Sequence, residues 1–347
     1  MPPERVPVAH DDLERLLTDI YVAYGMRNDD AAVLARVLVW ANLRGIDSHG
    51  VSRALRYIEL CEKGEANATP EIRIEQPRAA VLMVDADRAP GPVALTAAMN
   101  AAIETARETG VAWAAVGGTT LTGAVGYYTS LAAEQGMVGI CMVAGMPNMA
   151  YEGARGAAVA TSPLSIAVPA AGHPAVLLDM ATAIIALGKI TQFKNQGKEL
   201  PPGVAATKDG EPTTDPELAA VPLPLGGAKG SGMSLVFELL TSVLTGNAIV
   251  SPFHSGDKRH RQNGAVVALD VAAFTDLDEF RRVVDETLDA LKALPRRNQS
   301  EEIRFPGERG AAVEADRRAN GIPVPKKVWE SLTAEAERTG VAVPDPA

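Results

Sequence analysis

From about residue 72 onward, short apolar segments alternate with alanine-rich segments of helical length, and this alternation most constrains the fold. Segments of strand length lie at residues 80–84, 111–116, 137–143, 165–168 and 176–178. Helical segments are expected at about 92–109, 125–135, 181–195 and 233–245, while residues 252–263 are polar and are expected to form a mobile loop. Chains that alternate in this way fold into sheets covered by helices. The sequence therefore predicts a mixed α/β body over the middle of the chain.

The two ends of the chain show a different, helical pattern. Apolar residues recur at the spacing of one helix face over 13–21, and a second helix is expected nearby, with Asp29 or Asp30 as its N-cap. A third helix is expected over about 52–63. After Asn298 the chain is charged and again helical in pattern.

The composition excludes several classes of function. The formal net charge is −10 and no basic patch stands out, which disfavours nucleic acid or an anionic membrane surface as a partner. The longest stretch without a formal charge, residues 156–178, contains Pro163, Pro169 and Pro174 and suits short buried strands better than a membrane-spanning helix. The N-terminus lacks the apolar segment of a signal peptide. We therefore expect a cytoplasmic protein that binds neither nucleic acid nor membranes.

Several familiar signatures are missing from the sequence. The cysteines, Cys61 and Cys141, are too few for a disulfide framework in a chain of 347 residues and indicate free thiols. No Cys/His spacing suits zinc, so no metal site is predicted. Neither a G-x-G-x-x-G nor a Walker pattern occurs. A serine hydrolase is disfavoured because no G-x-S-x-G nucleophile elbow is found.

Residues 44–53 form the densest cluster of chemically useful side chains. His49 lies beside glycines between two helices, and Arg53 follows four residues later. If a helix begins near Ser48, the side chains of His49 and Arg53 share one face. An imidazole can supply a proton near neutral pH, and a guanidinium can bind a carboxylate through two hydrogen bonds. A capping loop, in which Ser48 or Asp47 caps a helix and Arg53 forms a surface ion pair, explains the same spacing.

Two further segments also allow two interpretations. Asp179 ends an apolar strand, and it either caps the helix that follows or orients His49. Segment 226–232 is rich in glycine and opens a helix, so its backbone amides and Lys229 could hold a phosphate. Close packing of its glycines against a neighbouring element explains that composition equally well.

Taken together, these segments resemble the type-2 malate/L-lactate dehydrogenase family over nearly the whole chain. The most specific marker is the Asp-Ser-His-Gly element at 47–50 combined with Asp-Met-Ala-Thr at 179–182. The other markers lie at residues 44–46, 53, 123–128, 188–190, 212–216, 225–230 and 306–308.

The resemblance implies a fold, a cofactor and a reaction. The fold is a nicotinamide-binding sheet domain without the Rossmann topology, here residues 76–295, plus a helical domain built from both chain ends, residues 1–75 and 296–347. The cofactor is NADH or NADPH, and the protein is a homodimer with its active site near the subunit junction. The reaction is hydride transfer between nicotinamide and a small carboxylate-bearing 2-oxo or 2-hydroxy acid, or a related C=N compound.

The resemblance also implies roles for individual residues. His49 would be the proton donor, with Ser48 and Asp179 as the relay that positions and polarises it. Arg53 would bind the substrate carboxylate, and Thr161 would also contact the substrate. The residues implied to line the cofactor are Leu121, Thr122, Gly123, Asp179, Met180, Ala181, Lys229, Gly230, Pro306, Gly307 and Glu308.

The sequence departs from the family pattern at positions expected to be polar. The family usually has a histidine where this chain has Leu121, and a Thr-Asn pair where it has Ala144-Gly145. Ser162 replaces the usual asparagine of a Gly-Thr-Asn-Pro element. These changes favour a substrate other than malate or lactate, such as a less polar oxo acid or a cyclic imine of the piperideine- or pyrroline-2-carboxylate type. A catalytically silent, nucleotide-binding member of the family is the alternative from another class.

Overall fold

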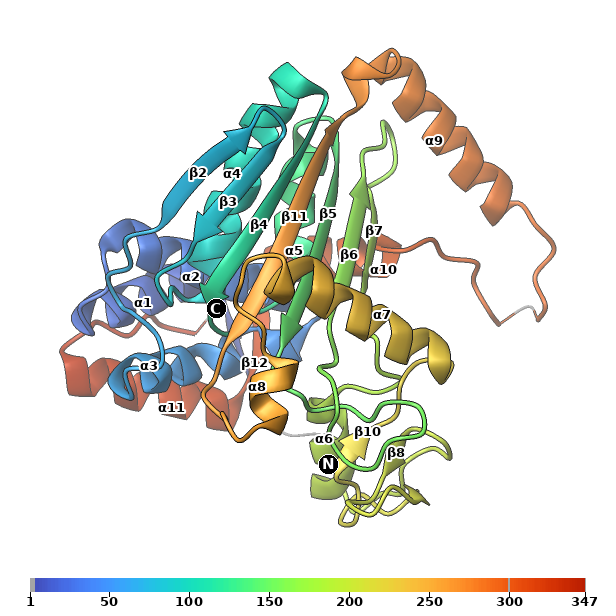
Figure 1. The fold of residues 1–347 in the computed structure, drawn as a ribbon. Coiled ribbons are helices and arrows are strands. Elements are labelled where there is room, and N and C mark those ends of the chain that lie inside the picture. The colour runs from blue at the N-terminus through green and yellow to red at the C-terminus, as the bar shows by residue number, and fades with distance from the viewer. Residues whose placement is uncertain (1–3, 299, 347) are drawn as a thin grey trace.

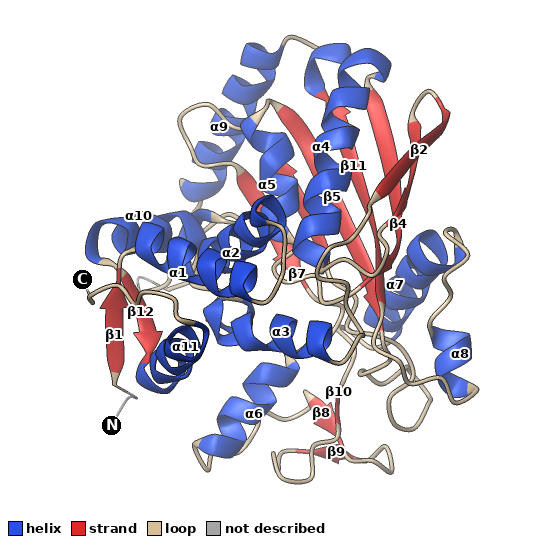
Figure 2. Ribbon diagram, turned by 90° about the vertical axis from the view of Figure 1, so that its left-hand side faces the viewer, coloured by secondary structure: helices blue, strands red, loops and turns tan. Residues whose placement is uncertain are grey.

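The computed structural model describes residues 4–298 and 300–346, in which the helices and strands form a sheet body and a helical body (Figures 1 and 2). The main sheet contains, in spatial order, β2 (Arg73–Arg78), β3 (Val81–Asp85), β4 (Val111–Thr119), β11 (Gln262–Asp270), β5 (Met137–Gly145), β6 (Leu164–Val168) and β7 (Val176–Met180). Strands β3 and β4 are parallel, and the other neighbours pair antiparallel. The predicted mixed α/β class is confirmed.

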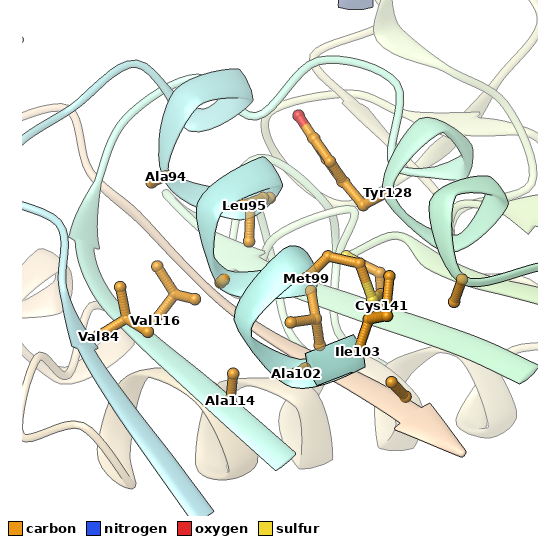
Figure 3. Packing of buried hydrophobic residues seen from close by; sticks show 14 of the residues in the cluster. Val84, Ala94, Leu95, Met99, Ala102, Ile103, Ala114, Val116, Tyr128 and Cys141 are labelled. Atoms are coloured by element: carbon orange, nitrogen blue, oxygen red, sulfur yellow. The ribbon is translucent and has the colours of Figure 1, made fainter. Parts of the chain in front are cut away.

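Two helices, α4 (Gly91–Thr109) and α5 (Gly126–Glu134), cover one face of this sheet and form its main core. Met99 and Ile103 of α4 lie beside Cys141 of β5 there, and Val116 of β4 belongs to the same cluster (Figure 3). A Cβ on Gly139 of β5 would lie 2.6 Å from a backbone oxygen of α5, so only glycine permits this approach. The small side chains that characterise these segments therefore let the helices lie close to the strands.

The opposite face of the sheet is covered in part by α7 (Ala228–Glu238), which continues as a π-helical turn at Leu239–Val243 (Figure 1). Phe237 packs there in a smaller cluster with Met142 and Ala265 of the sheet. The two faces thus differ, because one carries a deep core and the other a small one.

The helical body joins the two ends of the chain. It contains α1 (His10–Ala23), α2 (Asn28–Leu43), α3 (Ala54–Glu62), α10 (Glu308–Asn320) and α11 (Lys326–Thr339). Strands β1 (Arg5–Val8) and β12 (Ile322–Pro325) pair antiparallel beside them. Leu17 and Leu34 share a core cluster with Val324 and Leu332, so the ends are packed into one core. The domain boundaries at residues 75/76 and 295/296 stay a prediction.

The remaining elements lie at the edges of the sheet body. They are α6 (Leu187–Asn195), α8 (Val250–His254), α9 (Leu277–Lys292) and a small sheet of β8 (Ala205–Ala206), β9 (Pro212–Thr213) and β10 (Val221–Pro222). Within the described ranges, every helix is too short or too polar to cross a membrane.

Several element boundaries predicted from the sequence are wrong. The helix expected from residue 181 begins at Leu187, because residues 181–186 contain bends and Ala183 bridges to Pro224. The helix expected from residue 233 begins at Ala228, so Gly230 and Gly232 lie inside it. The helix that was to be capped by Asp29 or Asp30 begins at Asn28, and neither carboxylate forms a capping hydrogen bond.

The most consequential strand, β11, was not predicted. It pairs with β5 along its whole length and with β4 along most of it, and it occupies the middle of the sheet. Residues 263–268 are all buried, so the alternation of buried and exposed positions that marks a half-buried strand is absent.

Candidate active site

The loop between α2 and α3 carries three of the predicted site residues together. Two short 3-10 turns, Asp47–His49 and Val51–Arg53, form this loop. The hydroxyl oxygen of Ser48 lies 3.0 Å from Nδ1 of His49, and Nε of Arg53 donates a hydrogen bond of 2.9 Å to the carbonyl oxygen of Ser48. The cluster is therefore formed by hydrogen bonds within a loop, and the single helix face predicted for it is wrong.

The guanidinium of Arg53 is placed to bind an anion. Its side chain is exposed, and no carboxylate within residues 4–298 or 300–346 forms an ion pair with it. A Cβ placed on Gly188, at the start of α6, would lie 3.8 Å from Nη2 of Arg53 and 3.9 Å from Cβ of Ser48. The start of α6 therefore borders this cluster. The surface ion pair expected of a purely structural Arg53 is not found among these residues.

The protein environment changes the acidity of His49. Desolvation of the half-buried ring lowers its pKa below the ordinary value, and the positive charge of Arg53 lowers the pKa further. A carboxylate bound to Arg53 would cancel that charge and so favour the protonated ring. The arrangement can therefore couple binding of an anion to protonation of His49.

Asp179 lies within β7, opposite Ser165 of β6. Its Oδ2 accepts a hydrogen bond of 3.0 Å from the backbone N–H of Gly126, the first residue of α5. A carboxylate at a helix N-terminus is favourable because it faces unpaired N–H groups. The prediction that Asp179 caps the helix after it is wrong, since its carboxylate caps a helix that begins 53 residues earlier.

The carboxyl group of Asp179 is enclosed by protein but still reached by solvent. Desolvation raises its pKa to about 6, while the hydrogen bond from Gly126 and the charge of Arg44 act in the opposite direction. Its side chain nevertheless remains exposed. No hydrogen bond joins Asp179 to His49 or Ser48 in the described part of the chain. The relay implied by the resemblance therefore stays a prediction.

The turn after β4, residues 121–123, lies where the sheet body meets the helical body. Leu121 packs against the core of the helical body. The N–H of Thr122 donates to Oε1 of Gln262 over 2.9 Å, and the hydroxyl of Tyr128 donates to the carbonyl of Thr122 over 2.5 Å. Gly123 follows with a left-handed φ of 69°. The turn predicted to line the cofactor is thus held from β11 and from α5.

The start of α7 has features of an anion site. Gly226 and Gly227 have left-handed φ values of 59° and 62°, and the exposed Lys229 has no ion-pair partner among the described residues. Backbone N–H groups at a helix N-terminus together with a lysine suit a phosphate or pyrophosphate. Gly230 is explained by packing instead, because its Cβ would lie 2.4 Å from the carbonyl oxygen of Thr182. Lys229 is the group here that could pair with the pyrophosphate of a dinucleotide cofactor, because the N–H groups of Gly227, Lys229 and Gly230 already donate to carbonyl oxygens of the same turn.

The chain from Leu177 to Gly188 passes the other predicted parts of the site. The N–H of Leu177 donates to the carbonyl of Pro306 over 2.9 Å, and a Cβ on Gly307 would lie 2.8 Å from Cβ of Leu177. Glu308 begins α10 and forms an ion pair with Lys292. Met180 ends β7 and Ala181 follows it, directly before the residue that contacts Gly230. Of the segments predicted to line the cofactor, 179–181 therefore lies within residues 177–188, and 229–230 and 306–308 lie next to them.

Two polar residues that the sequence did not indicate hold parts of the site. Asn148 accepts the N–H of Thr161 through Oδ1 over 2.8 Å, and the carbonyl of Thr161 accepts the N–H of Thr182. Gln262 holds Thr122, as described above. Gln262 lies 140 residues from Thr122 and Asn148 lies 13 residues from Thr161, so neither contact follows from the spacing within one helix or turn.

The chain matches a known protein family. The family model described as malate/L-lactate dehydrogenase matches residues 8–333. Malate dehydrogenase from Pyrococcus abyssi is 34% identical, and the match covers 97% of this chain and 96% of the relative.

Solved structures give the same result. Sulfolactate dehydrogenase from Methanocaldococcus jannaschii superposes with a TM-score of 0.87 at 32% identity, covering 98% of this chain and 99% of that one. Delta1-piperideine-2-carboxylate reductase from Pseudomonas syringae pv. tomato superposes with a TM-score of 0.85 at 30% identity, covering 95% and 99%. The chain is therefore similar both to hydroxy-acid dehydrogenases and to a cyclic imine reductase.

Proposed function

Because the chain belongs to the malate/L-lactate dehydrogenase family and is an oxidoreductase, we propose that it reduces a small carboxylate-bearing 2-oxo acid or C=N compound with NADH or NADPH. The cluster of Ser48, His49 and Arg53 is the observation that carries this proposal. It combines a titratable ring with an exposed guanidinium that has no ion-pair partner among the described residues, as an acid substrate requires.

In this proposal Arg53 binds the substrate carboxylate and His49 protonates the substrate. Desolvation is the larger cause of the lowered pKa of His49, and the charge of Arg53 adds to it; the bound carboxylate neutralises that charge and so favours the protonated ring. Ser48 accepts or donates a hydrogen bond at Nδ1 and thereby orients the ring, which leaves Nε2 to deliver the proton. Thr161 lines the substrate side of the site.

The nicotinamide cofactor supplies the hydride when it is bound. The segments that would hold it are 121–123, 179–181, 229–230 and 306–308, and Lys229 would pair with its pyrophosphate. Asp179 would fix the N-terminus of α5 through Gly126 and present an ionised carboxylate toward the site at neutral pH.

Reduction of a cyclic imine is the second candidate reaction. Leu121 stands where the family usually has a polar residue, and it packs against apolar neighbours. An apolar wall suits a ring-shaped substrate such as piperideine-2-carboxylate better than oxaloacetate, whose second carboxylate would need a partner.

Oxidation of NADH and of NADPH by the purified protein tests the proposal. The substrates would be pyruvate, oxaloacetate, a bulkier apolar 2-oxo acid and piperideine-2-carboxylate. We expect turnover of at least one of them, and a fall in kcat of about 10²–10⁴ in His49→Ala with cofactor binding retained, because general acid catalysis is lost. The control is His10→Ala, which removes a histidine paired with Asp11 outside the site. Loss of cofactor binding together with activity in His49→Ala would show that the residue is structural.

A catalytically silent, nucleotide-binding relative is the competing proposal. If the protein binds a cofactor but turns over none of these substrates, Leu121→His distinguishes the two. Activity gained on malate or lactate would show a working site with altered specificity. An inert variant would favour the silent relative.

We also propose a homodimer that buries the outer face of α7 and of the π-helical turn that follows it. Six apolar side chains there are between 37% and 54% exposed: Leu235, Val236, Leu239, Leu240, Val243 and Leu244. An apolar surface of this kind marks an interaction site. Val236→Asp should give a monomer in light scattering, whereas Leu218→Asp, at a residue 60% exposed outside this stripe, should not. A dimer that survives Val236→Asp would contradict the proposal that this surface forms the dimer interface.

We also propose that the protein lies in the cytoplasm, where the free thiols of Cys61 and Cys141 stay reduced.

A further inference from the structure

The position of the His49 loop depends on a residue from the opposite end of the chain. Arg317 of α10 forms hydrogen bonds to both carboxylate oxygens of Asp47, with Nη1 at 2.6 Å from Oδ1 and Nη2 at 3.2 Å from Oδ2. Nη1 also donates to the backbone carbonyl of Asn42, at the end of α2. These partners are 270 residues or more from Arg317 along the chain, so α10 bridges the end of α2 and the first residue of the loop.

Asn42 completes the network from the other side. Its Nδ2 donates to Oδ1 of Asp47 over 2.8 Å, and its Oδ1 accepts the N–H of Val51 over 2.8 Å. The side chain is 2% exposed, so these hydrogen bonds are shielded from water. A Cβ on Gly50 would lie 2.1 Å from Oδ1 of Asn42, which leaves room only for glycine. His49 is thus enclosed between Asp47 and Val51, both of which are anchored.

The partners of Asp47 decide the direction in which its pKa shifts. Burial alone would raise the pKa of Asp47, but the hydrogen bonds from Arg317 and Asn42 outweigh it and lower the pKa. The Arg317 side chain is only 12% exposed, and an Arg–carboxylate pair with two hydrogen bonds fixes geometry as well as charge. The neighbouring Arg318 differs, because it is half-exposed and pairs with Glu314 within its own helix.

We propose that Arg317 is a positioning residue for the reaction: through Asp47 and Asn42 it holds the loop so that His49 and Arg53 stay in register with the rest of the site. The same helix begins at Glu308, in a segment that would line the cofactor, and Arg44 ties its first turns to α2 through the carbonyl of Gly307 and the carboxylate of Glu314. One rigid helix therefore links the cofactor segment to the proton donor. This inference rests on the proposed function of His49.

Arg317→Ala, with Arg318→Ala as its matched control, tests the proposal. We expect kcat to fall about tenfold to a hundredfold, as for a reacting group displaced by about 1 Å, with the KM for the cofactor unchanged. Free guanidinium added at millimolar concentration should restore part of the activity of Arg317→Ala. Equal activity in Arg317→Ala and the control would overturn the proposal, as would a loss that guanidinium does not rescue.

Asp47→Asn keeps the shape of the partner and provides a second route should Arg317→Ala fail to fold. The proposal expects the Arg317→Ala/Asp47→Asn double variant to lose clearly less activity than the product of the two single losses, since both variants break the Arg317–Asp47 pair. Multiplicative losses would overturn it.

A readout that does not need turnover separates this inference from the proposed function. The chain has 5 histidines, so NMR of protein labelled in the histidine rings can follow His49, whose signal is the one absent from His49→Ala. Arg317→Ala should shift that signal and raise its apparent pKa toward the ordinary value, because the freed ring is better hydrated. The control should leave the signal unchanged. An unshifted signal overturns the positioning role, whereas a shifted signal with an inactive wild type would mean that the proposed reaction is wrong and the positioning is correct.

Discussion

The loop that carries His49 and the strand end that carries Asp179 are both parts of the proposed site, but they are held in place by different interactions. Asp179 is positioned by the sheet, because β7 pairs with β6 in a continuous backbone register from Leu164–Met180 to Val168–Val176. His49 has no such frame. Its loop is held by side chains, chiefly those of Asn42 and Arg317.

This difference teaches where the site tolerates substitution. Backbone pairing is insensitive to side-chain identity, so a change at Asp179 alters charge while the strand stays in place. A side-chain network depends on every member, and removing one partner leaves the others buried without hydrogen bonds. We therefore expect changes in the loop network to affect the rate and changes at the strand end to affect mainly electrostatics.

The largest effect beyond loss of His49 is expected for Arg53→Ala. Losing a charge-assisted contact to the substrate carboxylate should raise KM by about tenfold to a hundredfold with a smaller change in kcat. Steady-state kinetics on the best substrate would measure both. The matched control is Arg56→Ala, one turn along α3, which breaks only a pair with Glu59. Equal KM values for the two variants would exclude Arg53 from substrate binding.

Two glycine substitutions compare the regions directly. In Gly50→Ala the new Cβ would lie 2.1 Å from Oδ1 of Asn42, and in Gly126→Ala it would lie 2.8 Å from Oδ2 of Asp179. Overpacking of this kind costs about 1–3 kcal/mol, and Gly50→Ala should be the worse because Asn42 is buried and cannot move aside. Urea denaturation would measure the free energy of unfolding.

Gly232→Ala is the control for both, since a Cβ at Gly232 has no neighbour within 4 Å and alanine is the better helix former. It should be neutral or slightly stabilising. Gly126→Ala destabilising the protein more than Gly50→Ala would reverse the comparison between strand end and loop.

The smallest effect is expected for Asp179→Asn, and it depends on pH. The pKa of Asp179 is raised to about 6 in the folded protein, above the value of about 4 in an unfolded chain, so its carboxyl group favours folding only while protonated. This stabilisation is complete below about pH 4 and is lost as the pH rises through about 6. The asparagine side chain does not ionise, so the variant does not lose this stabilisation as the pH rises. Its free energy of unfolding should therefore increase relative to that of the wild type between these pH values.

We expect that gain to reach about 1 kcal/mol at neutral pH, a value reduced for the solvent exposure of the side chain. Denaturation at several pH values would measure it, and a difference between the two proteins that is constant with pH would contradict the raised pKa. If kcat also falls sharply in Asp179→Asn while stability rises, the relay between Asp179 and His49 gains support.

Some of this site was predictable because it is local. Ser48, His49 and Arg53 lie within six residues, and hydrogen bonds within a turn follow from such spacing. The strands at 111–116, 137–143 and 176–178 were also predicted, because each is a short apolar segment bounded by turn residues. Strand β11 was not predicted, although residues 264–269 form an apolar segment of similar length, and its place between β4 and β5 is known only from the tertiary structure.

By itself, the sequence determined the residue types, the mixed α/β class and the local cluster around His49, because these depend on spacing along a few turns of chain. Only the tertiary structure decided that Asp179 would cap α5 through Gly126, and that Arg317 would reach Asp47 across 270 residues. Such contacts depend on how the helices and the sheet pack, and packing is the joint result of the whole chain burying its apolar surface.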